Sequence, residues 1–351
     1  MCIKHCFHPF WLGNAWREVM DKYKEAADLL MNCVGEGSAI MQLPNTLIPS
    51  TLKEAYTVQA YIETPDNPRV GWKLAATSIA GQKHIGVSGP IVGRITSKMS
   101  LSLGQFVSTK ANNMMVAEPE FVFVFNRRIE PRDRSYTKEE AMELISELKL
   151  GLEFPNSRFI KFETAGELSL IADNACAHEF MLGPTAPEIW RNLELSEHKV
   201  VGWIGTKSKF EGVGSNVLGG PVNALLWFLN EASKRKFVIR EGDFVTTGTT
   251  TQPMPFEMGD KIIGDFGEQV EKDLVEIAEG LGAKGSIYYQ EEALGTAHAI
   301  YCAAPSLTGN LVVAFADTLF RADFTLDSEA DGIIWTKQIE DPSAFGVVKL
   351  D

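Results

Sequence analysis

Cysteine is scarce in this chain and is not arranged for cross-linking. There are five cysteines in 351 residues, and their spacing matches neither a disulfide framework nor a structural zinc site. Cys2 and Cys6, together with His5 and His8, could form half of a zinc site, but a partner pair is missing. So few cysteines are typical of a protein in a reducing compartment, and we predict a cytoplasmic location.

The chain also lacks an excess of basic residues and any long apolar run. Its 33 lysines and arginines are outnumbered by 46 acids, which gives a formal net charge of -13. This charge argues against non-specific binding to nucleic acid and provides no attraction to anionic membranes. No apolar run approaches the ~18 residues of a membrane span. The N-terminal residues do not resemble a signal peptide either.

Composition divides the chain into three parts. Residues 1–19 are rich in Cys, His and Trp and show no periodicity, whereas a clear amphipathic helix opens at Met20, which could be the true start. Residues 20–268 form the second part. Most of the net negative charge falls in the third part, residues 269–351. We therefore predict a leader, a main domain and a separate C-terminal segment.

Two acids lie within an apolar run, and this is the most informative stretch of the chain. Residues 116–125 are rich in Val and Phe and predict a strand, in which Glu118 and Glu120 would point to the same face. A third acid, Glu153, lies in a similar setting. Adjacent carboxylates beside apolar residues repel unless a cation lies between them, and three oxygen ligands suit Mg²⁺ or Mn²⁺. A solvated strand face carrying acids would explain the same residues, so the pattern alone leaves both alternatives open.

The main domain alternates strands and glycine-rich turns with few helices between them. Helices are predicted at residues 54–61, 138–148 and 221–230, and further strands at residues 243–248 and 260–266. Because few helices connect successive strands, the pattern argues against a doubly wound sheet. It favours an α+β fold with a largely antiparallel or mixed β-roll and peripheral helices.

Seven ordered stretches of the main domain resemble a known family. They are residues 71–78, 84–87, 89–94, 117–120, 152–159, 172–175 and 247–253. Through them, residues from about 20 to 267 resemble the 2-keto-4-pentenoate hydratase and 4-oxalocrotonate decarboxylase group of the fumarylacetoacetase superfamily. The resemblance implies the mixed β-roll of that superfamily with a small helical N-terminal part, and a homo-oligomer formed through this domain.

The resemblance also implies a metal site and a substrate. Glu118, Glu120 and Glu153 would hold one divalent ion, Mg²⁺ or Mn²⁺. A short 2-oxo acid, unsaturated or with a second acid group, would chelate the ion through its 1-carboxylate and 2-oxo oxygens. The ion would then act as a Lewis acid that stabilises the dienolate formed during tautomerisation or decarboxylation.

Lys73 matches the active-site lysine of the family. Desolvation and a nearby cation would lower the pKa of this lysine, which favours a role as a proton shuttle. On the residues alone, a lysine whose stem is buried and whose ammonium reaches solvent is the alternative.

Further polar residues are candidates for binding the substrate. Ser157 and Asn174 would contact the substrate carboxylate or an attacking water, with turn capping as the alternative. Thr249 and Thr251 lie in a Thr-rich loop whose hydroxyls could close the pocket. His84 is a minor candidate.

The C-terminal segment resembles a different family. Residues 290–299, 313–318 and 342–351 are similar to the inner part of a sugar-1-phosphate nucleotidyltransferase. That resemblance implies nucleotide contacts at Gln290 and Gly295, a Mg²⁺ ligand at Asp317, and a sugar site lined near Gly346. Helices at residues 270–281 and 296–304, alternating with strands at residues 286–289 and 311–316, predict an incomplete α/β, Rossmann-like segment.

The second resemblance departs from its family at an essential point. No glycine-rich loop with an arginine, which would hold the triphosphate, precedes residue 270. We therefore expect the segment to be vestigial and to lack transferase activity. A fused or truncated reading frame would explain the combination.

The sequence thus predicts a metal-dependent hydratase or decarboxylase that acts on a short unsaturated 2-oxo acid, such as 2-hydroxypenta-2,4-dienoate, in aromatic-compound catabolism. Both reactions pass through the same kind of dienolate, so the sequence does not separate them. A nucleotidyltransferase is disfavoured by the missing loop. A non-catalytic protein of the same fold is disfavoured by the intact Glu118, Glu120, Glu153 and Lys73.

Overall fold

The computed structural model describes residues 10–110, 112–205, 208–267, 275, 278–288, 290 and 294–314, with the backbone alone at residues 10–21. The chain divides into two compact units, Met1–Val270 and Glu271–Asp351. Within the described residues, no helix is long and apolar enough to cross a membrane.

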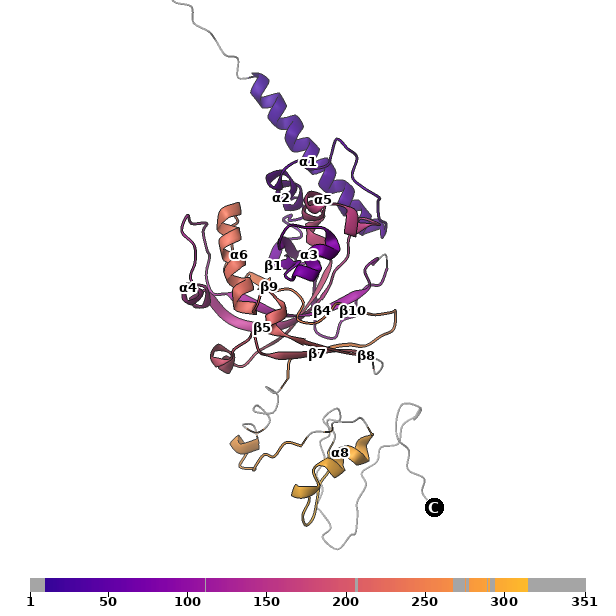
Figure 1. Cartoon of the computed structure of the whole chain (residues 1–351), viewed down its shortest axis with the longest axis vertical. Helices are drawn as coiled ribbons and strands as arrows, with labels where there is room; N and C mark the ends of the chain where they lie inside the picture. Colours follow the sequence, from indigo (N-terminus) through magenta and orange to yellow (C-terminus); the bar gives the residue numbers. More distant parts are fainter. Residues whose placement is uncertain are drawn as a thin grey trace, which may run out of the picture. The chain divides into compact units, whose positions relative to one another are not determined.

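The first unit combines helices with two sheets (Figure 1). Its described helices are α1 (Phe10–Glu36), α2 (Leu52–Ala60), α3 (Ile79–Ile85), α4 (Lys138–Glu143), α5 (Glu167–Ala172) and α6 (Pro221–Arg235). Its described strands are β1 (Arg69–Ala75), β2 (Ile91–Thr96), β3 (Ser100–Ser102), β4 (Val116–Phe125), β5 (Ile145–Phe154), β6 (Glu179–Thr185), β7 (Lys199–Ile204), β8 (Ser208–Val213), β9 (Phe244–Thr246), β10 (Met254–Pro255) and β11 (Ile262–Asp265).

The larger sheet is mixed and has β4 near its centre. The strand order among the described residues is β2-β1-β9-β4-β5-β6-β3, with β10 also paired to β4. β1 pairs with β9 and β3 with β6 in parallel, and the other pairs of this sheet are antiparallel. The smaller sheet has the order β11-β7-β8. This confirms the prediction of an α+β fold with a mixed sheet and N-terminal helices.

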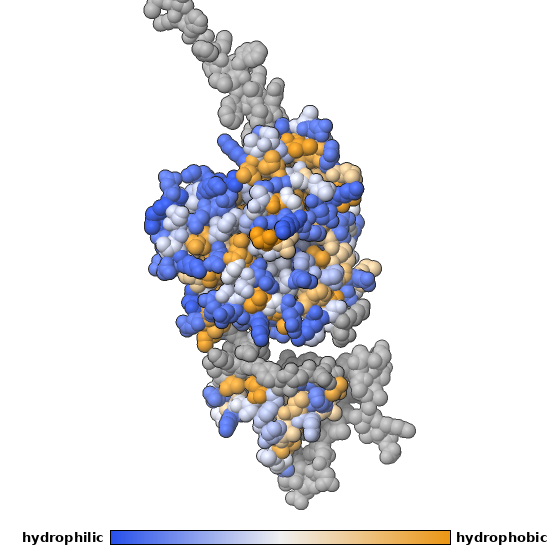
Figure 2. Space-filling model, in the orientation of Figure 1, coloured by the Kyte–Doolittle hydropathy of each residue, from blue (hydrophilic) through white to orange (hydrophobic). Residues whose placement is uncertain are grey.

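Helix α6 packs its apolar face against the larger sheet. The Trp72 ring of β1 stacks on Phe237 with centroids 5.0 Å apart and also contacts Phe228 of α6 at 5.7 Å. Trp72 and Phe228 are fully buried. Burying each such side chain contributes roughly 1.5–3 kcal/mol, so these rings hold β1, and with it Lys73, in a fixed place. Figure 2 shows that polar residues cover much of the visible surface of this unit.

Capping residues set the starts of two helices. Thr51 caps α2 by accepting a hydrogen bond from the Glu54 N–H at 3.2 Å. Thr137 and Glu140 form a reciprocal capping box at the start of α4.

Several helix boundaries differ from the prediction, most of all at α4 and α1. α4 ends at Glu143 rather than at residue 148, because residues 145–148 instead pair in β5 with β4. α1 begins at Phe10, ten residues before the predicted start, so part of the predicted leader is helical.

The described residues of the second unit do not form the predicted parallel sheet. α8 (Thr296–Cys302) confirms the predicted helix, and a 3-10 turn follows at Ala304–Ser306. Residues 286–288 and 311–314 are irregular, where strands were predicted. A strand must pair its backbone groups with a neighbour, and the described residues of this unit provide no such neighbour. The predicted Rossmann-like segment is therefore not supported.

Candidate metal centre and pocket

Three carboxylates converge at the middle of the larger sheet. Glu118 and Glu120 are two residues apart on β4, and the antiparallel register places Glu153 of β5 directly opposite Glu118. One oxygen from each of the three residues lies within 4.8 Å of the others. Glu120 and Glu153 are fully buried. The structure thus brings the three predicted acids together, while their binding of a metal ion stays a prediction.

The acids have fewer hydrogen-bond donors than their charges require. Glu120 Oε2 accepts a hydrogen bond of 2.7 Å from the Gly248 N–H. Its Oε1, and Oε2 of Glu153, are buried and accept no hydrogen bond from the described residues. A buried carboxylate oxygen without a donor costs on the order of 1–3 kcal/mol or more. These oxygens therefore need a cation or a proton.

The raised pKa values of two of these acids also indicate that they need a cation or a proton. Burial, reinforced by the charge of Glu153 and opposed by Lys73, raises the pKa of Glu118 to about 7. Burial also raises the pKa of Glu120 well above its usual range, with Glu153 and Glu118 adding to the effect. A divalent ion among the three oxygens would replace the protons. The donor set, which consists of carboxylates, fits Mg²⁺ or Mn²⁺.

Lys73 reaches the acids from β1. Its ammonium lies 2.9 Å from Glu153 Oε1 and donates a hydrogen bond of 3.0 Å to the Ala175 carbonyl. The residue is 2% exposed, which excludes the alternative of an ammonium in solvent. Burial lowers the pKa of Lys73, but the charges of Glu153 and Glu118 outweigh it and the net pKa is raised. The predicted lowering is thus not found in the metal-free protein, because two acids from other strands surround the ammonium.

A left-handed turn supplies the carbonyl that holds Lys73. Asn174, Ala175 and Cys176 have φ values of 54°, 52° and 61°. This region costs on the order of 1–2 kcal/mol for each residue with a side chain. Asn174 stabilises the turn, since its side chain donates to the Arg94 carbonyl at 2.8 Å and accepts from the Arg94 N–H at 2.7 Å.

Two predicted substrate contacts are engaged elsewhere. The Asn174 amide is bonded to β2, as described above. Ser157 donates a hydrogen bond of 2.7 Å to Asp173, and Asp173 is ion-paired with Arg158. Neither Ser157 nor Asn174 lines the large pocket. Their polar atoms instead bond to protein groups around the left-handed turn, and a contact of either residue with substrate stays a prediction.

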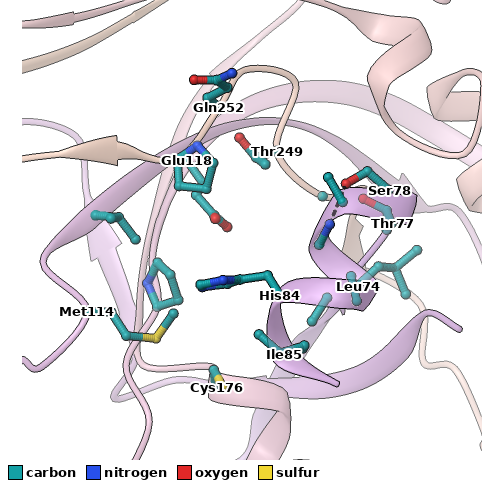
Figure 3. A pocket seen from close by; sticks show the side chains of 18 of the residues that line it. Leu74, Thr77, Ser78, His84, Ile85, Met114, Glu118, Cys176, Thr249 and Gln252 are labelled. Carbon is teal, nitrogen blue, oxygen red and sulfur yellow. Dashed lines mark hydrogen bonds between the residues drawn. The ribbon is translucent and has the colours of Figure 1, made fainter. Parts of the chain in front are cut away.

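A pocket of about 740 Å³ opens beside the acids. Figure 3 shows Glu118 and His84 pointing into it, with Thr249 and Gln252 on one side of His84 and Ile85, Met114 and Cys176 on the other. Lys73, Thr249 and Thr251 also line the pocket. The two threonine hydroxyls bond to backbone carbonyls of their own loop, Thr249 to Thr251 and Thr251 to Gln252.

The sequence reasoning missed some residues that line the pocket. They include Thr77, Ser78, Met114, Cys176 and Gln252. Thr77 and Ser78 could have been predicted, because they follow Lys73 closely in residues 71–78, one of the stretches that carry the family resemblance. Met114 and Cys176 carry no local signal. Their places depend on how the segments before β4 and before β6 meet.

The candidate residues of the C-terminal segment are only partly described. The Gln290 side chain donates a hydrogen bond of 2.9 Å to the Gly295 carbonyl and lies 3.0 Å from His298 Nδ1. Asp317 and Gly346 lie outside the described residues, as do Cys2, Cys6, His5 and His8. The contacts of Gln290 are those of a local turn and do not form a nucleotide site.

Comparison with known proteins identifies the first unit. Residues 49–278 match the family described as Fumarylacetoacetate (FAA) hydrolase C-terminal. The chain belongs to the fumarylacetoacetate hydrolase family. The second resemblance gains no support from this family match, which ends at residue 278.

The relatives of this chain include hydratases and a decarboxylase. The chain is 27% identical over 245 residues to the "TodF product hydratase" of Pseudomonas putida strain F1, covering 68% of this chain and 88% of the relative. It is 27% identical over 249 residues to the 2-keto-4-pentenoate hydratase of Paraburkholderia xenovorans strain LB400, with the same coverage, 68% and 88%. It is also 27% identical over 247 residues to the 4-oxalocrotonate decarboxylase of Pseudomonas sp. strain CF600, covering 69% and 92%.

A solved structure of this family has the same fold. The 4-oxalocrotonate decarboxylase of Pseudomonas putida G7, complexed with magnesium and adipate, aligns with a TM-score of 0.63 at 25% identity. The alignment covers 70% of this chain and 93% of the decarboxylase. The mixed sheet and N-terminal helices described above are therefore the fumarylacetoacetate hydrolase type of fold.

Proposed function

We propose that this chain is a divalent-metal-dependent lyase that acts on a short unsaturated 2-oxo acid. The observation that carries the proposal is the convergence of Glu118, Glu120 and Glu153 with Lys73 at the edge of one pocket. The hydratases and the decarboxylase among the relatives, and the magnesium bound to one of them, support the same function.

Each part of the site has a task in this proposal. Glu118, Glu120 and Glu153 would hold Mg²⁺ or Mn²⁺, which when bound supplies a Lewis acid for the 2-oxo group. Lys73, which lies beside Glu153, donates or accepts the proton that moves when the carbon chain of the substrate is protonated. The left-handed turn fixes the ammonium through the Ala175 carbonyl.

We favour hydration of 2-hydroxypenta-2,4-dienoate, with decarboxylation of 4-oxalocrotonate as the second candidate. In the hydration, one water adds across the C4–C5 double bond, and the enol proton moves to C3 as the 2-oxo group forms. The test is an assay of the purified protein with both compounds, in the presence and absence of Mg²⁺ or Mn²⁺. We expect the metal-loaded protein to consume one of the two compounds and the metal-free protein to consume neither. A folded, metal-loaded protein that consumes neither compound would reject the proposal. The predicted homo-oligomer remains a prediction, which sedimentation of the same sample can test.

Glu120→Gln tests the metal ligands in the same assay. The variant keeps an oxygen but loses the charge, and we expect it to abolish metal-dependent turnover. The matched control is Glu147→Gln on β5, because the Glu147 side chain is 42% exposed, ion-paired with Lys149 at 3.0 Å and outside the pocket. Equal activity of the two variants would show that Glu120 is not a ligand.

A further inference from the structure

The wall of the pocket has a polar side and an apolar side. Glu118, Thr249 and Gln252 lie on one side of the His84 ring in Figure 3, and Ile85, Met114 and Cys176 lie on the other. Phe162 also lines the pocket, and its ring packs against His84 in an edge-to-face arrangement with centroids 5.8 Å apart. A substrate whose acid end lies at the carboxylates would therefore place its other end against apolar and aromatic side chains.

The pocket is also larger than a five-carbon acid requires. 2-Hydroxypenta-2,4-dienoate has eight non-hydrogen atoms. The pocket volume of about 740 Å³ lies within the range of ~300–1,000 Å³ that encloses drug-sized ligands. Filling the remaining space with an apolar group would remove that group and the apolar wall from water, which strengthens binding.

The charged residues that line the pocket argue against a second carboxylate on the substrate. Among the described lining residues, the charged side chains other than the histidine are Lys73, Glu118 and Glu211. Lys73 is already paired with Glu153, and no arginine is present in this described lining. A distal carboxylate would thus lose water without gaining a cation, and this desolvation is unfavourable.

We propose that the natural substrate carries an uncharged apolar group, about the size of an aromatic ring, at the end of the carbon chain away from the 2-oxo acid. This inference rests on the proposed function and narrows it. The group lies against Ile85, Met114 and Phe162, and the edge-to-face pair of His84 and Phe162 provides an aromatic surface for it. The inference favours a hydratase of a substituted dienoate over a decarboxylase of a dicarboxylate.

The test measures binding of three unreactive acids to the full chain loaded with Mg²⁺, by titration calorimetry. The acids are 2-oxopentanoate, 5-phenyl-2-oxopentanoate and 2-oxohexanedioate. We expect the phenyl compound to bind at least about tenfold more tightly than 2-oxopentanoate, and the dicarboxylate to bind no more tightly than 2-oxopentanoate. A dicarboxylate that binds most tightly would overturn the inference.

A matched pair of variants on α3 locates the apolar group. Ala80 is exposed and lines the pocket, whereas its neighbour Ile79 is 66% exposed and does not line it. Ala80→Phe should fill the space and remove the tenfold preference for the phenyl compound while leaving 2-oxopentanoate binding within about twofold. Ile79→Phe should change neither affinity. If both variants keep the preference, the group does not lie in this pocket and the inference is wrong.

The outcomes separate the inference from the proposed function. If 2-oxopentanoate binds only with Mg²⁺ and the phenyl group adds nothing, the inference fails and the proposed function stands. If none of the three acids binds to the Mg²⁺-loaded protein, both fail.

Discussion

Lys73 is a buried cation with two fixed partners, the Glu153 carboxylate and the Ala175 carbonyl. Replacing it with Met keeps an unbranched apolar side chain of similar length but removes the ammonium. Because the proposed task of Lys73 is proton transfer, we expect Lys73→Met to lower kcat by about 10²–10⁴-fold and to change KM by no more than roughly threefold. Steady-state kinetics with the dienoate substrate check this.

The control for this variant is Lys149→Met. Lys149 is also a strand lysine with an ion-paired ammonium, but it is bonded to Glu147 and Thr185 outside the pocket. If both lysine variants lose kcat equally, or if Lys73→Met raises KM alone, the proton-transfer role is contradicted.

The raised pKa values of Glu118 and Glu120 give the metal site a pH dependence. In the metal-free protein burial raises the pKa of Glu118 to about 7 and that of Glu120 further above its usual range. Protons must therefore leave when Mg²⁺ binds, and metal affinity must fall as the pH drops through 7. We expect the Kd of Mg²⁺ to rise roughly tenfold per pH unit for each proton displaced.

Calorimetric titration of Mg²⁺ between pH 6 and 8 measures this slope, and buffers of different ionisation enthalpy count the protons released. Glu118→Gln removes one of the titrating groups, so its slope should be shallower. A Kd that does not change over this pH range would contradict the assignment of these acids as ligands.

The left-handed turn and β2 are in close contact beside Lys73. A side chain at Gly93 would place its Cβ 2.5 Å from the Asn174 carbonyl oxygen and 2.9 Å from Lys73 Cγ. Gly93→Ala should therefore push the turn and Lys73 apart. We expect a loss of about 1–3 kcal/mol in the free energy of unfolding and a lower kcat. Denaturant unfolding and kinetics on the same sample measure both.

Gly89→Ala is the matched control. Gly89 lies just before β2, and an added Cβ there meets no atom within 4 Å. Its stability and kcat should stay close to those of the parent chain. Similar losses in both variants would show that crowding at Gly93 is not the cause.

Some elements follow from local sequence, and others depend on distant contacts. β4 has the predicted bounds, because its apolar and aromatic residues favour a strand and both of its faces are mostly buried. The left-handed turn gives no signal, since neither Ala175 nor Cys176 favours a positive φ. The residues at positions 145–148 fit the apolar spacing of a helix, yet pairing with β4 makes them part of a strand.

In the candidate site, too, some features follow from local sequence and others depend on distant contacts. The shared face of Glu118 and Glu120 follows from their spacing, and Glu153 joins them through the strand register. The raised pKa of Lys73 could not be predicted, because Glu153 is distant in sequence and only the sheet brings it to the ammonium. The engagement of Ser157 with Asp173 is likewise a property of the folded loop.

At the scale of the whole molecule, the site draws on segments that span much of the first unit. Lys73 lies on β1, two acids on β4, one on β5, and Gly248 follows β9. Each of these strands is held by its neighbours in one sheet. A metal ion that binds only this arrangement stabilises the folded state, by a free energy that grows with the logarithm of the free ion concentration above Kd.

The C-terminal unit contributes none of the described residues that line the pocket. The described pocket residues end at Pro253, and the family match ends at residue 278. Leu311, Val312 and Val313 are 50%, 58% and 48% exposed, so this unit leaves apolar side chains in water. A chain that ends after Leu281 should therefore keep kcat and KM within roughly twofold of the full chain and should aggregate less.

A second chain, with more residues removed, shows which part of the C-terminal region the first unit needs. A chain that ends after Gly259 loses β11, which pairs with β7, and Phe266, whose ring packs on Phe121 with centroids 5.1 Å apart. Losing that strand and ring bares the edge of β7 and part of the core, so this chain should unfold or lose activity. Light scattering, thermal unfolding and the dienoate assay compare the three lengths. If the chain ending after Leu281 stays folded but loses activity, the C-terminal unit is a working part of the enzyme.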